Sequence, residues 1–515
     1  MRWWTWLIGV LVALALVPAG AAQAAVVQGE TLKVHPGVRF YDVLARADRP
    51  GAPLMLYLAG GPGASSLAPV FVGNGPWRLE DPFGTGRPQV TDNPWSFTRL
   101  VNVVYLDQPR HTGFSTGRAP YVTSVRAAGA DVMAWLRAFD RRHPDLADRP
   151  LLLAGESFAG AYVADLTRRM LAGQGGRHRF AGVFLEAPSL GRTDAAPART
   201  EVDAACAMGL VSADGCATLR AWLEHCGARS IAAVARASAR GCRRLHGQLA
   251  LQPMRVGELR FGHGRRVPRA LRGQRIPQPL DGLQFPAGGL IRNHLGVSPN
   301  PYDVALPCRP SGGFPPWCYD DRKLTALLDD PATRARLGGR IPPRRPWRFA
   351  DFRVSVALSF RDRPQSNVPY AAALRAGVPV TILFGARDWV VNPVTGRWLT
   401  DRIAAAAGPD AARRLTVALL DAGHLVGHDQ PEQTYRLLEK SVSSSATADA
   451  PAPAPSISSM RRFVALPPRA LKPPSRPPAA TTRWQGTTIG SGLWPIAWPT
   501  AWAAPGSPSS AAISP

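Results

Sequence analysis

Short apolar runs alternate with helix-like segments along the middle of the chain. Six runs rich in Val, Leu and Tyr predict strands at 53–59, 101–107, 151–154, 182–186, 378–384 and 415–420. Runs that stay apolar over this length are typical of strands buried on both faces. The alternation therefore predicts an α/β fold, with a mainly parallel central sheet and helices on both of its faces.

This rhythm is interrupted from about Thr193 to Pro346. The interrupted stretch is rich in Arg, irregular in pattern and contains every cysteine of the chain. We interpret 193–346 as a cap insertion over the ligand-binding edge of the sheet. It divides a core whose first part is 25–192 and whose second part is 347–440.

The two ends of the chain differ from this core. An apolar run from Trp3 to Val17 and an A-x-A site at Ala22 to Ala24 predict a secretory signal peptide over 1–24, hence export to the periplasm or the medium. An uncleaved anchor is disfavoured because the run is shorter than the roughly 20 residues that span a bilayer. Residues 441–515, rich in Pro, Ser and Ala, are excluded from the fold. Both a disordered or wall-spanning tail and a translated artefact past a true end near Lys440 stay open.

Composition narrows the class of protein. The chain has 515 residues, 45% of them hydrophobic, and a net charge of +25 from 61 basic and 36 acidic residues. This balance excludes a wholly disordered chain, collagen, a coiled coil and a small disulfide scaffold. The positive charge alone does not indicate nucleic-acid binding, because no binding motif or aromatic-basic interleaving accompanies it.

Six cysteines in an exported chain predict disulfides. They are Cys206, Cys216, Cys226, Cys242, Cys308 and Cys318. The turn-forming Pro and Gly residues between Cys308 and Cys318 favour a bond between those two, and the other four allow three pairings. A metal site is the alternative, but there is no C-x-x-C and no His at ligand spacing.

The segment around Ser157 predicts a nucleophile elbow. Ser157 follows a predicted strand and precedes a helix-like segment, 162–171, and its neighbours two residues away are the small Gly155 and Ala159. Such a turn exposes the serine hydroxyl in a strained backbone. The N–H of Phe158, at the helix start, is expected to stabilise an oxyanion.

A serine nucleophile needs a base, and the base needs an orienting carboxylate. Asp388 and His424 each follow a predicted strand, so both are expected at the carboxyl edge of the sheet beside Ser157. Asp107 is a competing acid, but it precedes the serine and is expected to fix the loop 108–117. Gly61, in the glycine-rich loop after 53–59, is the expected second oxyanion donor. A phosphate loop is excluded because no G-K-[ST] follows.

Together these segments resemble the serine carboxypeptidases of the α/β-hydrolase fold. The similar blocks, in order, are Gly60–Leu67, Leu106–Pro109 with Thr112–Ser115, Gly155–Gly160, Asn300–Asp303, Asp388–Asn392 and Ala422–Pro431. The resemblance covers roughly 38–438. It implies Ser157 as nucleophile, His424 as base, Asp388 as orienting acid, and Gly61 and Phe158 as oxyanion donors.

The resemblance also implies a subsite for the substrate's C-terminal carboxylate, with Tyr57, Gly60 and Glu156 among its residues. Family members bind this carboxylate with an Asn before the Gly-Gly pair and with the Glu before the serine. Here Ala59 replaces the Asn, so one hydrogen-bond donor is missing. Arg110 and His111, in the loop after Asp107, are candidate substitutes.

These observations predict an exported serine-type carboxypeptidase that acts on peptides through an acyl-enzyme. We expect no metal, no organic cofactor, no nucleic-acid partner and no stable membrane insertion after signal cleavage. The oligomeric state is open. An esterase, acyltransferase or aminopeptidase-like hydrolase with the same triad is the first alternative, because of Ala59. A non-catalytic protein that binds polyanions is the second.

Overall fold

The computed structural model describes residues 26–191, 196–210, 213–225, 299–307, 318–339, 341, 345–359 and 368–447. All of these residues fall in one structural unit. The predicted signal segment, the chain after Thr447, and Cys226, Cys242 and Cys308 lie outside the described residues.

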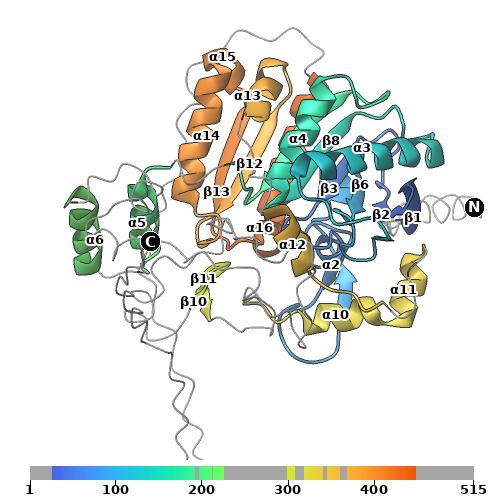
Figure 1. Cartoon of the computed structure of the whole chain (residues 1–515), viewed down its shortest axis with the longest axis horizontal. Coiled ribbons are helices and arrows are strands. Elements are labelled where there is room, and N and C mark those ends of the chain that lie inside the picture. Colours follow the sequence, from blue (N-terminus) through green and yellow to red (C-terminus); the bar gives the residue numbers. More distant parts are fainter. Residues whose placement is uncertain are drawn as a thin grey trace, which may run out of the picture. The chain divides into compact units, whose positions relative to one another are not determined.

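A nine-stranded sheet forms the centre of the fold, in the order β1-β2-β6-β3-β8-β9-β12-β13, with β7 paired to β2 (Figure 1). Its strands are β1 (Val27–His35), β2 (Val38–Ala45), β3 (Leu54–Leu58), β6 (Asn102–Leu106), β7 (Thr116–Gly117), β8 (Leu151–Glu156), β9 (Phe180–Glu186), β12 (Val380–Gly385) and β13 (Leu415–Leu420). From β6 to β13 every neighbouring pair is parallel. The six predicted strands and the mainly parallel sheet are therefore confirmed.

One side of the sheet was not predicted from the sequence. β1 and β2 form an antiparallel hairpin, and β2 is also antiparallel to β6. Along β1 only Gly29 and Glu30 are buried. A strand at the edge of a sheet, with little covered surface, lacks the continuous apolar run that marks a central strand.

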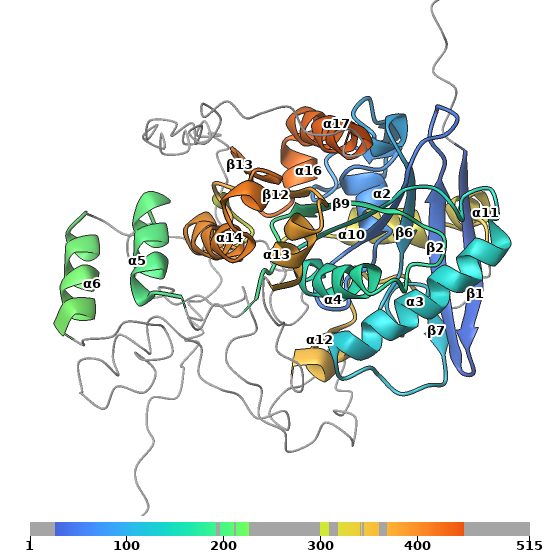
Figure 2. The same cartoon turned by 90° about the horizontal axis from the view of Figure 1, so that it is seen from above.

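Helices cover both faces of the sheet, as predicted. Alternate residues of a strand point to opposite faces, so Leu54, Leu56 and Leu58 of β3 join one apolar cluster, and Met55 and Tyr57 join the other. The first face carries α3 (Val125–Arg142), α4 (Ala159–Leu171), α13 (Val368–Arg375) and α14 (Pro393–Ala407), and the second carries α2 (Ala68–Val72), α16 (Val426–Asp429) and α17 (Pro431–Thr447) (Figure 2). The helix α10 (Arg322–Asp329) joins the second apolar cluster through Leu324 and Leu328. The helix predicted after Ser157 is α4, which begins three residues earlier than expected.

Smaller elements complete the described chain. They are β4 (Trp77–Leu79), β5 (Val90–Asp92), the 3-10 helix η1 (Phe97–Arg99), α5 (Ala198–Ala207), α6 (Ala213–His225), β10 (Pro299–Asn300), β11 (Asp303–Pro307), α11 (Pro331–Leu337), α12 (Phe352–Ser359) and α15 (Pro409–Ala412). Of these, α5, α6, β10, β11 and α11 lie in the predicted insertion, as does α10.

The disulfides are settled in part. Cys206 at the end of α5 is bonded to Cys216 in α6, with their Cα atoms 5.9 Å apart. α5 in turn packs against α14. Cys318 is also disulfide-bonded. Since Cys308 lies outside the described residues, the pair Cys308–Cys318 stays a prediction.

The fold ends later than the sequence suggested. α17 continues past Lys440 to Thr447, and Ser441 and Val442 are buried. Ser443 and Ser444 donate their hydroxyls to carbonyls one turn earlier in the same helix. The Ser-rich composition predicts a tail from 441 onward, whereas the helix continues through these serines. Serines whose hydroxyls bond back to the preceding turn can remain in a helix.

Candidate active site

Ser157, Asp388 and His424 follow three parallel strands of the sheet. Ser157 comes directly after β8, Asp388 follows β12 and His424 follows β13. The carboxyl ends of parallel strands lie at one edge, so all three residues lie at that edge. Glu156, the residue before the serine, is close enough for its charge to act on His424.

Ser157 occupies a sharp turn between β8 and α4. Its φ of 59° lies in the left-handed region, which residues with a Cβ rarely adopt. Ser157 N donates to Glu186 O at 3.0 Å, and Ser157 O accepts from Ser189 N at 2.8 Å. A Cβ at Gly155 would lie 2.4 Å from Leu58 O, so only glycine fits there. The turn therefore has the backbone strain and small neighbours of a nucleophile elbow.

Asp388 and His424 form a buried hydrogen-bonded pair. The distance from His424 Nδ1 to Asp388 Oδ2 is 2.7 Å, and the side chains are 4% and 0% exposed. Asp388 Oδ1 also accepts from Val391 N at 3.0 Å, and His424 N donates to Tyr302 O at 2.6 Å. Burial by itself would lower the pKa of His424, but the charge and hydrogen bond of Asp388 outweigh it and raise that pKa. A proton held on Nδ1 leaves Nε2 as the basic nitrogen.

The glycine-rich loop after β3 packs directly against the elbow. A Cβ at Gly60 would lie 2.5 Å from Phe158 N and 2.7 Å from Ser157 Cβ. Gly61 has a φ of 101°, again in the left-handed region. Phe158 is the N-cap of α4, where backbone N–H groups lack partners within the helix. The loop and the helix start thus bring backbone donors to the serine.

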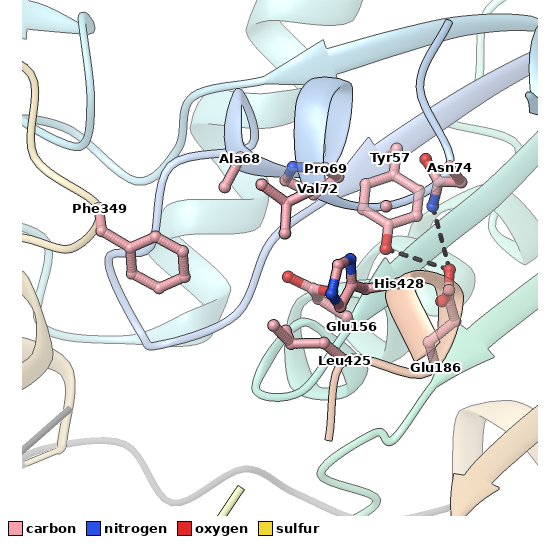
Figure 3. A pocket seen from close by; sticks show the side chains of 12 residues that line it. Tyr57, Ala68, Pro69, Val72, Asn74, Glu156, Glu186, Phe349, Leu425 and His428 are labelled. Atoms are coloured by element: carbon pink, nitrogen blue, oxygen red, sulfur yellow. Dashed lines mark hydrogen bonds between the residues drawn. The ribbon is translucent and has the colours of Figure 1, made fainter. Parts of the chain in front are cut away.

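Two glutamates end neighbouring strands side by side. Glu156 on β8 pairs in register with Glu186 on β9, and both line one pocket (Figure 3). Tyr57 Oη and Asn74 Nδ2 donate to Glu186 Oε1 at 3.2 and 3.1 Å. Burial raises the pKa of both carboxyls, and the charge of Glu156 helps to raise the pKa of Glu186 to about 7. Below about pH 7 the pair therefore holds a proton in most molecules.

The rest of this pocket is largely apolar. Its other lining residues are Ala68, Pro69, Val72, Gly73, Phe349, Leu425, Gly427 and His428. Burial lowers the pKa of His428 to about 4, so this imidazole is neutral at pH 7. The pocket therefore combines a carboxyl pair with uncharged walls.

Neither candidate substitute for the missing Asn lines this pocket. Arg110 is bound to Asp131 through Nε at 2.6 Å and Nη2 at 3.0 Å. His111 Nε2 is hydrogen-bonded to Ala119 O at 2.8 Å. The suggestion that Arg110 or His111 replaces the family's Asn is therefore wrong, because both side chains are engaged elsewhere.

Asn74 and Glu186 were missed by sequence reasoning. A charged residue closing an otherwise apolar strand was the available signal for Glu186, but its register with Glu156 is a tertiary property. Asp107, by contrast, does what was expected. It accepts from Ser65 Oγ at 2.7 Å and Phe114 N at 2.8 Å and so fixes its own loop.

Two features are absent from the described residues. Within them, no group of three or more His, Cys, Asp or Glu side chains is arranged to hold a metal ion. No helix in the same ranges is long and apolar enough to cross a membrane.

The sheet, the elbow and the buried Asp–His pair define an α/β-hydrolase of the serine type. The serine carboxypeptidase family model matches residues 37–412. The chain therefore belongs to the serine carboxypeptidase family, as the sequence blocks implied.

Curated relatives match over shorter stretches. A carboxypeptidase Y homolog A from Fusarium vanettenii is 34% identical over 128 residues, which is 25% of this chain and 23% of the relative. Carboxypeptidase Y from Schizosaccharomyces pombe is 36% identical over 141 residues, 27% of this chain and 14% of the relative. The matched part thus spans less than a quarter of either relative.

A solved structure supports the fold. The prohormone-processing carboxypeptidase Kex1 from Saccharomyces cerevisiae superposes with a TM-score of 0.58, covering 81% of this chain and 91% of that one at 14% identity. Identity at this level shows a shared fold, and function has to be argued from the site.

Proposed function

We propose that the protein is a serine carboxypeptidase that releases the C-terminal residue of peptides through an acyl-enzyme. The observation that carries this proposal is that the carboxyl pair Glu156 and Glu186, which holds a proton, lies beside the elbow and the buried Asp388–His424 pair. Membership of the family indicates the chemistry, and the two glutamates give a physical reason for a preference for free C-termini.

The reaction follows from the roles of the named groups. Ser157 Oγ attacks the scissile carbonyl while His424 Nε2 takes the hydroxyl proton, and Asp388 holds the imidazole in place. The N–H groups of Gly61 and Phe158 stabilise the oxyanion of the tetrahedral intermediate. When the C–N bond breaks, His424 returns the proton to the leaving amine. Water, deprotonated by the same base, then hydrolyses the acyl-enzyme and restores the serine.

The carboxyl pair suits the leaving residue. A protonated carboxyl can donate a hydrogen bond to the C-terminal carboxylate, whereas two ionised glutamates would repel it. Tyr57 and Asn74 hold Glu186 in place, so Glu156 at the pocket surface is the contact we assign to substrate. The apolar walls formed by Val72, Phe349 and Leu425 suit a nonpolar C-terminal side chain.

The test compares an N-blocked dipeptide ending in Phe with its C-terminal amide, from about pH 4 to 8, where the carboxyl pair titrates. We expect cleavage of the acid only, and Ser157→Ala should lower kcat by about 10⁶-fold. Equal cleavage of acid and amide would favour the esterase-like alternative, for which Ala59 is the supporting observation. If neither is cleaved, the proposal fails, and labelling by a serine-directed phosphonate then shows whether Ser157 is nonetheless a reactive nucleophile.

We also propose that the chain is exported, with 1–24 removed as a signal peptide. The support is the apolar run followed by small residues at its amino end. Amino-terminal sequencing of protein recovered outside the cytoplasm should begin at Ala25. Recovery of intact chain in the cytoplasm would contradict export.

A further inference from the structure

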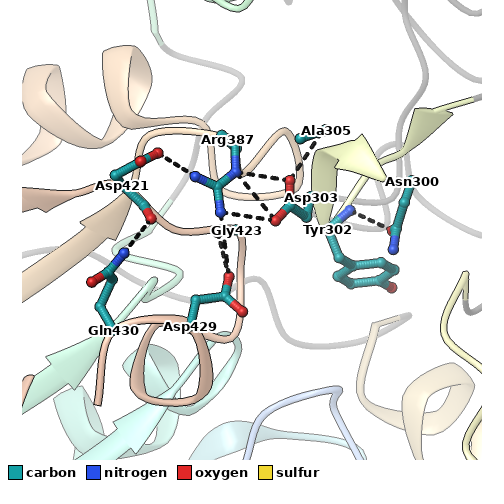
Figure 4. Close-up of polar contacts among 9 residues, drawn as sticks. All are labelled: Asn300, Tyr302, Asp303, Ala305, Arg387, Asp421, Gly423, Asp429 and Gln430. Carbon is teal, nitrogen blue, oxygen red and sulfur yellow. Dashed lines mark hydrogen bonds and ion pairs between the residues drawn. The ribbon is translucent and has the colours of Figure 1, made fainter. Parts of the chain in front are cut away.

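Three segments of the chain meet around the side chain of Arg387 (Figure 4). Arg387 lies between β12 and Asp388, and its guanidinium contacts Asp303 of β11 through Nε, at 3.0 and 3.2 Å, and through Nη2, at 3.1 Å. Its Nη1 donates to Asp421, in the loop before His424. Its Nη2 lies 4.0 Å from Asp429 Oδ2, just after that loop.

The backbones of the same three segments are joined as well. Arg387 N donates to Ala422 O at 2.9 Å, and Arg387 O accepts from Val304 N at 3.0 Å. Asp429 Oδ2 accepts from Gly423 N, next to His424, at 2.7 Å. The loop that carries Asp388, the loop that carries His424 and the strand β11 therefore form one connected polar unit.

We propose that Arg387 is a positioning residue that holds the Asp388 and His424 loops in register through its contact with Asp303. This inference rests on the proposed function, because it assigns a purpose to the geometry of the triad. It adds a residue from the predicted insertion, Asp303, to the support of that geometry.

Burial distinguishes this contact from an ordinary surface ion pair. Asp303 is 6% exposed and Arg387 is 26% exposed. A two-pronged guanidinium–carboxylate contact fixes orientation as well as distance, whereas exposed pairs contribute little. Asp421, at 68% exposed, adds less than Asp303. The contact with Asp303 is thus the one expected to set the geometry.

The cost of losing the contact should appear in the chemical step. Misplacement of a catalytic group by about 1 Å can slow a reaction on the order of 10²-fold. Glu156 and Glu186 end β8 and β9, and neither is bonded to Arg387, although Glu186 also accepts from the backbone of Gly427. Binding of the substrate carboxylate should therefore largely persist. We therefore expect kcat to fall and KM to stay nearly constant.

The experiment measures kcat and KM per active site, with sites counted by titration with a fluorophosphonate that reacts at Ser157. Arg387→Gln should lower kcat on the order of 10²-fold. Arg387→Lys keeps the charge but loses the two-pronged guanidinium contact, so its kcat should lie between those of the wild type and Arg387→Gln. Asp303→Asn tests the same contact if Arg387→Gln does not fold. The double variant Arg387→Gln with Asp303→Asn should be little worse than Arg387→Gln alone. The matched control is Arg397→Gln, which removes an exposed ion pair with Asp401 in α14 and should leave kcat unchanged.

The two readouts separate this inference from the proposed function. If the wild type reacts with the fluorophosphonate but cleaves no peptide, the carboxypeptidase proposal fails, and the labelling rate of Ser157 still reports on Arg387. If Arg387→Gln and Asp303→Asn lower only the melting temperature or the number of titratable sites, with kcat per site unchanged, the positioning role is overturned. A wild type that does not label at all overturns both.

Discussion

Ala59 changes the balance of interactions at the proposed carboxylate subsite. A hydrogen bond to a charged group contributes about 1.5–3 kcal/mol, so a side chain without a donor gives up roughly ten- to a hundredfold in binding. Glu186 lies in register with Glu156 and is buried. Its burial and the nearby charge of Glu156 raise its pKa, so the two carboxyls together hold a proton up to about pH 7. Recognition of the free carboxylate is thus expected to rest on one protonated carboxyl.

The pH dependence of KM tests whether the carboxyl pair Glu156 and Glu186 recognises the substrate carboxylate through a proton. Below about pH 7 the pair can donate a hydrogen bond, and above it the pair becomes doubly ionised and repels the substrate carboxylate. KM for the free-acid dipeptide should therefore rise about tenfold between pH 6 and 8. Glu186→Gln, which removes the carboxyl whose pKa burial raises to about 7, should remove most of that rise. An ester substrate without a carboxylate is the control, and a rise of KM with the ester as well would contradict the assignment.

The strands that the sequence predicts are those with a nearly continuous apolar pattern. The strands β3, β6, β8, β9 and β12 are buried and apolar over most of their length, and the edge strand β13 is also largely apolar, so all six could be predicted. Ser157, Asp388 and His424 each follow such a strand, as expected from the sequence. The hairpin of β1 and β2 was missed because its pattern is mixed. The contacts of Glu186 and Arg387 depend on strand register and loop approach, and no pattern within one segment encodes these.

The hairpin of α5 and α6 depends on the bond between Cys206 and Cys216. A disulfide over an interval of this length reduces the conformational entropy of the unfolded hairpin, which stabilises the folded hairpin by about 2–3 kcal/mol. Replacing both cysteines by Ser should therefore speed amide exchange in α6 on the order of 10²-fold. Exchange in β8 and labelling of Ser157 should not change. Unchanged exchange in α6 would mean that packing of α5 on α14 alone holds the hairpin.

The proposed active site is assembled from distant parts of the chain. Ser157 belongs to the first part of the core and Asp388 and His424 to the second, while Asp303 comes from the predicted insertion between them. The sheet joins these parts by placing β9 between β8 and β12. Folding of the whole molecule is therefore required before the triad exists, and stability and activity should be lost together on global unfolding.

Buried acids set the pH dependence of that global stability. Burial raises the pKa of Asp107 to about 6, of Glu186 to about 7 and of Asp429 to about 6, all above the values expected in the unfolded chain. Between about pH 4 and 7 the folded protein thus binds more protons than the unfolded one, so the free energy of unfolding falls as pH rises. The raised pKa of His424 acts in the same direction, and the lowered pKa of His428 opposes it.

We therefore expect the melting temperature to be several degrees higher at pH 5.5 than at pH 8 in moderate salt, where charge repulsion across the molecule is screened. Glu186→Gln should reduce this difference, because an amide has no ionised form to destabilise the core at high pH. The matched control is Glu224→Gln on the exposed side of α6, which should leave the difference unchanged. Calorimetry at the two pH values decides the matter. A higher melting temperature at pH 8 would show that these carboxyls are stabilised as anions in the folded protein, and it would remove the physical basis for a proton shared by Glu156 and Glu186.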